Sequence, residues 1–479
     1  MTVTGRVKAM SPESMSGRRR WAALVVMLLA VFMELLDGSI VNVAMPHIRR
    51  GLGMSDSATQ WVAVGYVLAH AVLIVTGGRL GDLVGRRRVF LAGVVGFTAA
   101  SACCGLAWAP WVLVGARLGQ GASAAAMVPQ VLALLQELFP AERRGRPFAV
   151  FSAVSGVATV AGPLVGAVLL DGDPLGLGWR AIFWINVPVG VAVVGAAVVL
   201  LPRSPGASTG LDIGGVVVAT SALLLLLHPL TVGRDLHWPL WTFVAMAASL
   251  PVGALFVRLQ RRIRRRGGVP LVALDLFGER TFAVGLVLAF VLHASFSGPF
   301  FVLSIFLQSG LGFTPRATAL AILPWTVGVP LGATAASAAL VPRFGRWTLT
   351  AGAVLMTGGF AGLAALVAGL GPALRPWHGL AVFGFAGVGM GLVVAPLLQF
   401  ALSRVPVVDA GSAAGVFAST QQVGAATGIA AVGTLFFAVA DGAPTPAAMA
   451  ATAATAAVLT TAVGAMTPLL PRTPEPARA

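Results

Sequence analysis

Two carboxylates interrupt the first long apolar run of the chain. Glu34 and Asp37 lie in "MELLDGSIVNVAMPHI" (33–48), and the run begins at Trp21, directly after three arginines. Residues three apart on a helix point within about 60° of each other, so the two acids share one face. Burial and like-charge repulsion both favour the protonated form of a carboxyl group, which suits such a pair to proton exchange. The structural alternative is that one acid only balances a buried cation, for which Arg117 is the candidate.

Arg117 is a second charge inside an apolar run, in "LVGARLGQGASAAAMVPQ" (113–130). A charge at this depth is costly unless it is paired, so a role in setting topology does not explain it. Further polar side chains within apolar runs are candidate substrate contacts, and each of them could equally serve helix packing: Asn42, Gln130, His293, Gln308 and Gln421.

Composition shows what kind of element must position these groups. The 479 residues are 57% hydrophobic and only 10% charged, whereas soluble domains carry about 25% charged residues. Apolar runs of about 20 residues recur along the chain, and helices satisfy their own backbone hydrogen bonds in lipid. The net charge of +16 would suit nucleic acid, but the basic residues lie in short loops between apolar runs. The sequence therefore predicts an all-α polytopic membrane protein that binds no nucleic acid.

Fourteen membrane spans are predicted from the apolar runs. They cover residues 21–43, 57–77, 88–107, 110–135, 147–170, 180–200, 211–231, 238–257, 281–307, 317–340, 347–369, 378–400, 412–438 and 446–470. An even number of spans places both termini on one side of the membrane. Counted with the termini inside, 25 Lys and Arg residues lie on the inner side and 6 on the outer side. The positive-inside rule therefore predicts cytoplasmic termini.

The longest basic block, "VRLQRRIRRRGGVP" (257–270), divides the spans into eight and six. It is interpreted as a solvated linker, with contact to anionic lipid as the alternative. A weak repeat links "GGRLGDLVGRRRVFLAG" (77–93) with "SAALVPRFGRWTLTAG" (337–352), and paired halves are typical of secondary transporters. The predicted organisation is a tail, a six-helix half, two inserted helices, a basic linker, a second six-helix half and a tail: 1–20, 21–200, 211–257, 258–280, 281–470 and 471–479.

The stretch from 78 to 88, "GRLGDLVGRRR", is the most specific motif, and we predict that it forms a loop. Its glycines permit a tight turn, and Asp82 could accept hydrogen bonds from a helix N-terminus. The motif resembles the cytoplasmic loop signature of the major facilitator superfamily, between its second and third helices. The resemblance implies a major facilitator fold in which this loop latches the two halves together in the outward-facing state. The residues that carry the match are Gly78, Asp82, Gly85, Arg86 and Arg87.

Four further stretches are similar to members of that superfamily, two of them to its fourteen-span drug:proton antiporter branch. The span around Arg117 resembles the family's arginine-bearing helix, and "SGVATVAGPLVGAVL" (155–169) resembles a motif of exporters. "LLDGSIVNVAMP" (35–46) and "GWRAIFWINVPVG" (178–190) resemble the fourteen-span branch in particular. Asp37 belongs to this pattern and Glu34 does not, so Asp37 is the favoured coupling acid. The exporter motif is carried by Gly156, Gly162, Pro163 and Gly166.

The resemblance implies proton-coupled export of drug-like or antibiotic small molecules by alternating access. We expect a multi-pass protein of a bacterial plasma membrane, functional as a monomer, driven by the proton gradient and without a cofactor. One alternative is proton-coupled uptake of a small metabolite, and measuring whether cells accumulate more or less of a labelled compound distinguishes the two. A membrane enzyme or sensor is the alternative from another class. The six histidines form no metal-ligand spacing and no "GxSxG" or "HExxH" occurs, so we expect no enzyme.

Overall fold

The structure is a computed structural model that describes residues 15–139, 145–173, 176–202, 212–268, 270–272, 274–405, 410–440 and 443–474. Within these ranges the regular structure is helical, and fourteen helices are long and apolar enough to cross a membrane. This confirms the predicted fold class. Parts of the predicted tails (1–14 and 475–479) and three basic loop residues counted for the orientation (Arg143, Arg144 and Arg203) lie outside the described residues.

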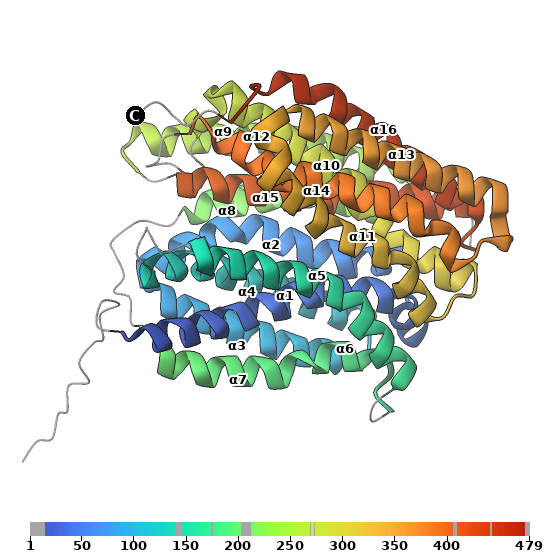
Figure 1. Ribbon diagram of the computed structural model, residues 1–479, viewed down its shortest axis with the longest axis horizontal. Helices are drawn as coiled ribbons and strands as arrows, with labels where there is room; N and C mark the ends of the chain where they lie inside the picture. Colours follow the sequence, from blue (N-terminus) through green and yellow to red (C-terminus); the bar gives the residue numbers. More distant parts are fainter. Residues whose placement is uncertain are drawn as a thin grey trace, which may run out of the picture.

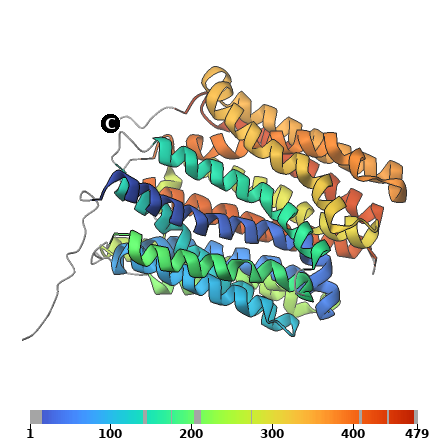
Figure 2. The same ribbon diagram turned by 60° about the horizontal axis from the view of Figure 1, so that its bottom comes forward.

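The first six spans form one bundle (Figures 1 and 2). Its helices are α1 (Gly17–Leu52), α2 (Asp56–Val84), α3 (Arg86–Gly105), α4 (Pro110–Leu138), α5 (Gly145–Gly172), and the last span, α6 (Ala181–Trp184) followed by α7 (Asn186–Leu200). Helix α1 is longer than the predicted 21–43. It begins after Ser16, whose hydroxyl accepts a hydrogen bond from the Arg19 N–H, and it ends at Gly53 with φ of 58°.

The last six spans form the second bundle. They are α10 (Arg280–Ile305) with the π-helical turn η6 (Phe306–Gly310), α11 (Pro315–Ala335) continued by η7 (Ala336–Leu340) and α12 (Val341–Phe344), α13 (Trp347–Leu370), α14 (Leu380–Leu402), α15 (Ala410–Ala440) and α16 (Pro446–Met466). The two remaining spans, α8 (Ile213–Val232) and α9 (Leu240–Arg265), lie between the bundles in sequence.

The two bundles repeat one packing pattern. Helix α1 packs on α5 and α7, as α10 packs on α15 and α16, and α4 packs on α2 and α3, as α14 packs on α11 and α13. The contacts between the bundles follow the same repeat, because α2 packs on α15 and α11 packs on α5. This pattern is that of two six-helix halves with two inserted helices, as predicted, and it leaves two equivalent seams between the halves.

The inserted helices make the two seams unequal. Helix α8 packs against α9, α2 and α15, and Figure 1 shows it beside the seam between α2 and α15. Helix α9 buries few of its side chains, and Leu240, Phe243 and Leu250 on it are exposed. An exposed apolar helix of this length faces lipid. The inserted pair therefore separates the α2–α15 seam from the bilayer.

Fourteen spans bring the start of α1 and the end of α16 to the same end of the molecule (Figure 1). We call this the terminal end and the opposite end the distal end.

Helices α2 and α4 approach each other closely because glycines face the partner backbone. A Cβ atom on Gly121 would collide with the carbonyl oxygen of Tyr66, and one on Gly77 with that of Ala125. Small residues permit such contact between membrane helices. The approach brings the α4 segment that carries Arg117 against the α2 segment that carries Tyr66.

Candidate functional site

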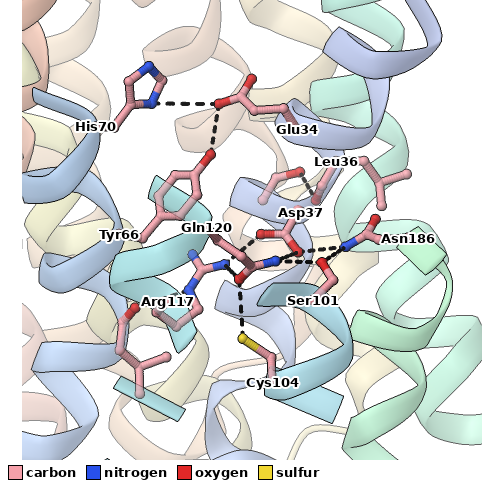
Figure 3. Close-up of polar contacts among 12 residues, drawn as sticks. Glu34, Leu36, Asp37, Tyr66, His70, Ser101, Cys104, Arg117, Gln120 and Asn186 are labelled. Carbon is pink, nitrogen blue, oxygen red and sulfur yellow. Dashed lines mark hydrogen bonds and ion pairs between the residues drawn. The ribbon is translucent and has the colours of Figure 1, made fainter. Parts of the chain in front are cut away.

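Asp37 is fully buried at the centre of a hydrogen-bond network in the N-terminal half (Figure 3). Arg117 Nη1 donates to its Oδ2 at 2.5 Å. Asn186 Nδ2 and Gln120 Nε2 donate to its Oδ1 at 2.8 and 3.2 Å. Three donors, one of them a guanidinium, stabilise an ionised carboxylate in a site from which water is excluded. The sequence left two roles open for the acids, proton exchange and the balancing of a buried cation. The geometry of Asp37 fits the second role, with Arg117 as the cation.

The Arg117 guanidinium is satisfied on its other sides as well. Its Nε donates to the Val62 carbonyl at 3.2 Å and its Nη1 to Gln120 Oε1 at 2.8 Å. The guanidinium carbon lies 4.2 Å from the centroid of the Tyr66 ring, a cation–π geometry. Arg117 is 2% exposed, so the whole pair is removed from solvent.

A break in the sixth span places Asn186 at this network. Pro188 has no N–H to donate to the carbonyl four residues earlier, and the helix is interrupted between Trp184, the end of α6, and Asn186, the start of α7. Asn186 is 1% exposed and donates to both Asp37 and Ser101. The motif that resembles the drug:proton antiporter branch thus supplies a direct partner of the acid in α1.

Glu34 lies in a different environment one turn earlier on α1. The Tyr66 hydroxyl donates to its Oε1 at 2.8 Å, and Nδ1 of His70 lies 3.8 Å from the same oxygen. Glu34 is 7% exposed, and within the described ranges no Arg or Lys forms an ion pair with it. Glu34 is therefore a buried acid without a fixed cationic partner.

The Glu34 group continues into the other half of the protein. Nδ1 of His70 also lies 3.1 Å from the Nε2 of Gln422 on α15. Next to it, Ser419 of α15 donates to the Ala71 carbonyl at 2.6 Å. The contacts of Glu34, His70 and Gln422 thus cross the α2–α15 seam at one atom, His70 Nδ1, which accepts from the Gln422 amide and lies 3.8 Å from the Glu34 carboxylate.

The 78–88 stretch is helical over most of its length, contrary to the predicted loop. Helix α2 continues to Val84, α3 begins at Arg86, and only Gly85, with φ of 104°, separates them. Gly81 faces Gln130 so closely that a Cβ atom would collide with the amide of that side chain. The glycines thus permit helix contact and one sharp corner.

Asp82 does not bond a helix N-terminus. Its Oδ1 pairs with Arg86 Nη2 at 3.2 Å, and Arg86 Nη1 reaches Glu137 at 2.8 Å. Arg87 donates to the Val198 carbonyl near the end of α7. These contacts all lie inside the N-terminal half, where they stabilise the turn between α2 and α3. The predicted latch between the halves stays a prediction.

The second half has an equivalent corner. Gly345, with φ of 55°, separates α12 from α13, and the Arg346 guanidinium donates to the carbonyls of Pro468 and Leu470 at 2.7 and 2.8 Å. In both halves an arginine at the corner between the second and third spans binds the carbonyl end of the sixth span. This shared device explains the weak sequence repeat.

The glycines of the exporter-type motif lie against the segment of α1 that follows Asp37. A Cβ atom on Gly162 would collide with Ser39 Oγ, and one on Gly166 would lie 2.8 Å from Ile40 Cγ1. Gly156 faces Pro330 of α11, across the second seam. The motif, with Pro163 inside helix α5, therefore places α5 in contact with both the acid-bearing helix and the other half.

Two predicted substrate contacts have structural bonds of their own. Gln130 is buried and donates to the carbonyls of Gly77 and Ala126, so both its N–H groups are used within the N-terminal half. Gln308, in the π-turn η6, donates to the Val43 carbonyl at 2.8 Å and joins the halves near the distal end.

The other three predicted contacts are only partly buried. Asn42 lies on α1 beyond Asp37, and Gln421 precedes the bridging Gln422. His293 on α10 bonds the Ala289 carbonyl through Nδ1 and lies 5.3 Å, between ring centroids, from Phe296. These three remain candidates for substrate contact.

Sequence reasoning missed several residues of the networks, among them Ser101 beside Gln120 and Asn186. Tyr66 bridges Arg117 and Glu34, and Gln120 and Asn186 complete the shell of Asp37. Two signals were present: Tyr66 is the only tyrosine of the chain, and Gln120 follows Arg117 by three residues on one helix face.

Comparison with known proteins places this architecture in a family. The model of the family described as Major Facilitator Superfamily matches residues 27–429. A probable actinorhodin transporter of Streptomyces coelicolor is 43% identical, covering 88% of this chain and 73% of the relative. A cephamycin export protein of Amycolatopsis lactamdurans is 34% identical, covering 94% and 92%. The chain belongs to the major facilitator superfamily and is a multi-pass membrane protein.

Solved structures agree at the level of the fold. The peptide transporter PepTSo of the POT family superposes with a TM-score of 0.67 at 16% identity, covering 93% of this chain and 98% of that one. A nucleoside transporter, NupG, superposes with a TM-score of 0.65 at 13% identity, covering 93% and 99%.

The buried pair generates a stability prediction. Arg117→Met leaves Asp37 without its cation and should lower the free energy of unfolding by about 3–5 kcal/mol. The charge-neutral double variant Arg117→Met/Asp37→Asn should recover part of that loss because no unpaired charge remains. Thermal unfolding of the detergent-solubilised protein measures both. A single variant as stable as the wild type, or a double variant less stable than the single, would contradict the pairing.

Proposed function

We propose that the protein is a proton-coupled exporter of drug-like small molecules. Membership of the major facilitator superfamily supports transport, and the relatives named for export or resistance support drug-like cargo. A puromycin resistance protein of Streptomyces alboniger is 34% identical over 87% of this chain. Actinorhodin, puromycin and cephamycin, the compounds in the relatives' names, are the first cargoes to test.

The observation that carries the proposal is the unequal environment of the two acids in α1. Asp37 accepts hydrogen bonds from Arg117 and two amides, whereas Glu34 has only a tyrosine hydroxyl and a histidine nearby. A nearby guanidinium favours the charged form of a carboxyl group. Burial without a cation favours the protonated form. Glu34 is therefore the exchanging acid in this proposal, although the family motif favours Asp37.

The mechanism follows from competition for one charge. Glu34 releases its proton on the cytoplasmic side, and the resulting anion in the apolar site attracts a cationic or amphipathic molecule. A proton from the outside then neutralises Glu34 and expels the cargo. Through His70 and Gln422 the same event alters the α2–α15 seam, which must open and close during alternating access.

In this proposal a cluster of aromatic side chains in the second half forms a wall for the cargo when the site opens. Trp325 lies 4.6 Å from Phe300 and 5.9 Å from Phe360 between ring centroids, and Phe296 joins the same group. Flat aromatic faces bind apolar and cationic molecules with little demand for a particular shape. His293, in contact with Phe296, adds a polar group beside this wall.

The proposal includes a functional monomer in a bacterial plasma membrane, driven by the proton gradient without a bound cofactor. We place the terminal end in the cytoplasm because 25 basic residues are predicted on the side of the termini and 6 on the opposite side.

The orientation is tested by labelling single cysteines in intact cells. In a Cys103→Ala background, Arg375→Cys at the distal end should react with a membrane-impermeant maleimide. Arg265→Cys at the terminal end should react only after permeabilisation. Both positions are exposed in the structure. The reverse pattern would place the terminal end outside.

Proton coupling is tested in everted membrane vesicles with an acridine dye that reports the pH gradient. Puromycin, which is an amine and therefore cationic near neutral pH, should induce proton efflux with the wild-type protein. Glu34→Gln should reduce this flux at least tenfold, corresponding to about 1.4 kcal/mol or more, because its amide cannot exchange a proton. Glu34→Asp should keep part of it.

The matched control is the charge-neutral pair Arg117→Met/Asp37→Asn, which should retain drug-induced proton flux if it folds. Normal drug-induced proton flux with Glu34→Gln would show that Glu34 is not the coupling acid. If the folded Arg117→Met/Asp37→Asn variant loses this flux while Glu34→Gln keeps it, Asp37 is the coupling acid.

A further inference from the structure

A cavity of about 460 Å³ lies beside the α2–α15 seam. Its walls come from α2, α8, α9, α10 and α15 and from the segment after α9, and nearly all of its lining side chains are apolar. Val72 of α2 and Val416 of α15 represent the two halves, and Leu223 of α8 and Phe256 of α9 the inserted helices. The volume falls in the range of about 300–1,000 Å³ typical of pockets for small ligands.

One charged side chain lines this cavity. Arg261, on the last turns of α9, is exposed, as is the lining residue Phe277. The cavity therefore combines a half-open, mainly apolar interior with a cation at a solvent- or lipid-accessible edge. Since α9 ends at the terminal end, this edge lies at the depth of the headgroups of one leaflet.

Arg261 belongs to a stripe of like charge. Arg258, Arg261, Arg262 and Arg265 are exposed and spaced three or four residues apart, so they share one face of α9. Helix α9 faces lipid along its apolar part, and the stripe continues that face to the membrane surface. Clusters of four or more basic residues at a membrane surface attract anionic lipid.

The wall at the terminal end is built by specific hydrogen bonds. Asp212, which caps α8, accepts from Gln260 Nε2 at 2.6 Å and from the Leu271 N–H at 3.2 Å. Gln260, 1% exposed, accepts from the Val272 N–H at 3.0 Å. These bonds hold the chain after the basic block against α8 and α9, so the cavity is a built feature of the inserted helices.

We propose that the cavity binds one anionic phospholipid, with an acyl chain in the apolar interior and the phosphate at Arg261. The walls of the cavity accept an alkyl chain, the arginine stripe attracts the negative headgroup, and α9 is in contact with the bilayer that supplies the lipid. A lipid there touches both halves of the protein at one seam only. The inference rests on the fold and is independent of the proposed proton coupling.

The test is native mass spectrometry of the purified full-length protein in detergent, titrated with dioleoyl phosphatidylglycerol or dioleoyl phosphatidylcholine. One phosphatidylglycerol should bind with preference over phosphatidylcholine. Arg261→Ala should weaken phosphatidylglycerol binding about fivefold, as expected for one surface arginine. Its control, Arg266→Ala, removes the same charge from the residue that caps the end of α9 and does not line the cavity, and it should have little effect.

A second pair of variants tests the interior. Ala219→Phe fills the cavity and should abolish the tight phosphatidylglycerol site, whereas Val217→Phe, at an exposed position on the same helix, should not. Equal binding of the two lipids, no effect of Arg261→Ala and Ala219→Phe in folded protein, or displacement by millimolar inorganic phosphate alone would overturn the proposal. The last result would indicate an anion site without a lipid.

Discussion

The buried ion pair between Asp37 and Arg117 is the constraint on which the N-terminal half depends. Neither charge can be left alone at this depth, so groups on α2, α3, α4 and α7 must surround the pair at fixed positions. Gln120 follows Arg117 on α4, Ser101 comes from α3, and Asn186 comes from the break before α7. The glycine contacts of α2 with α4 and of α5 with α1 bring these backbones close enough.

Once Asp37 is committed to its partner, Glu34 is free to change its charge. Tyr66 connects the two sites, since its ring lies on the Arg117 guanidinium and its hydroxyl bonds Glu34. The Arg117 guanidinium thus holds the Tyr66 ring in place, and the hydroxyl of that ring contacts Glu34, the acid proposed to exchange a proton. Through His70, Glu34 reaches α15 and therefore a seam between the halves. The inserted helices cover this seam and not its equivalent in the repeat, which gives one side of a nearly two-fold molecule its own cavity and its own contact with lipid.

The sequence predicted the fold well, because the lengths of the apolar runs and the positions of the basic loops largely determine the fold of a helical membrane protein. Fourteen spans and two halves follow from them directly. The 78–84 segment was wrongly expected to be a loop, because its glycines serve contact with Gln130 and not chain reversal, and that partner is remote in sequence. The site was only half predictable. Helix geometry placed Glu34 and Asp37 on one face, but their difference arises from Tyr66, Gln120 and Asn186, which only the packing of α2, α4 and α7 brings to them.

The central claim is that Glu34, and not Asp37, takes up and releases the proton. Infrared difference spectra of the purified protein test it directly, through the carbonyl stretch of a protonated carboxylic acid, between two pH values that both lie above the usual range of exposed carboxyl groups. The account predicts a pH-dependent band that is present in the wild type, absent in Glu34→Gln and retained in Arg117→Met/Asp37→Asn. A band that persists in Glu34→Gln and disappears in the neutral pair would contradict it.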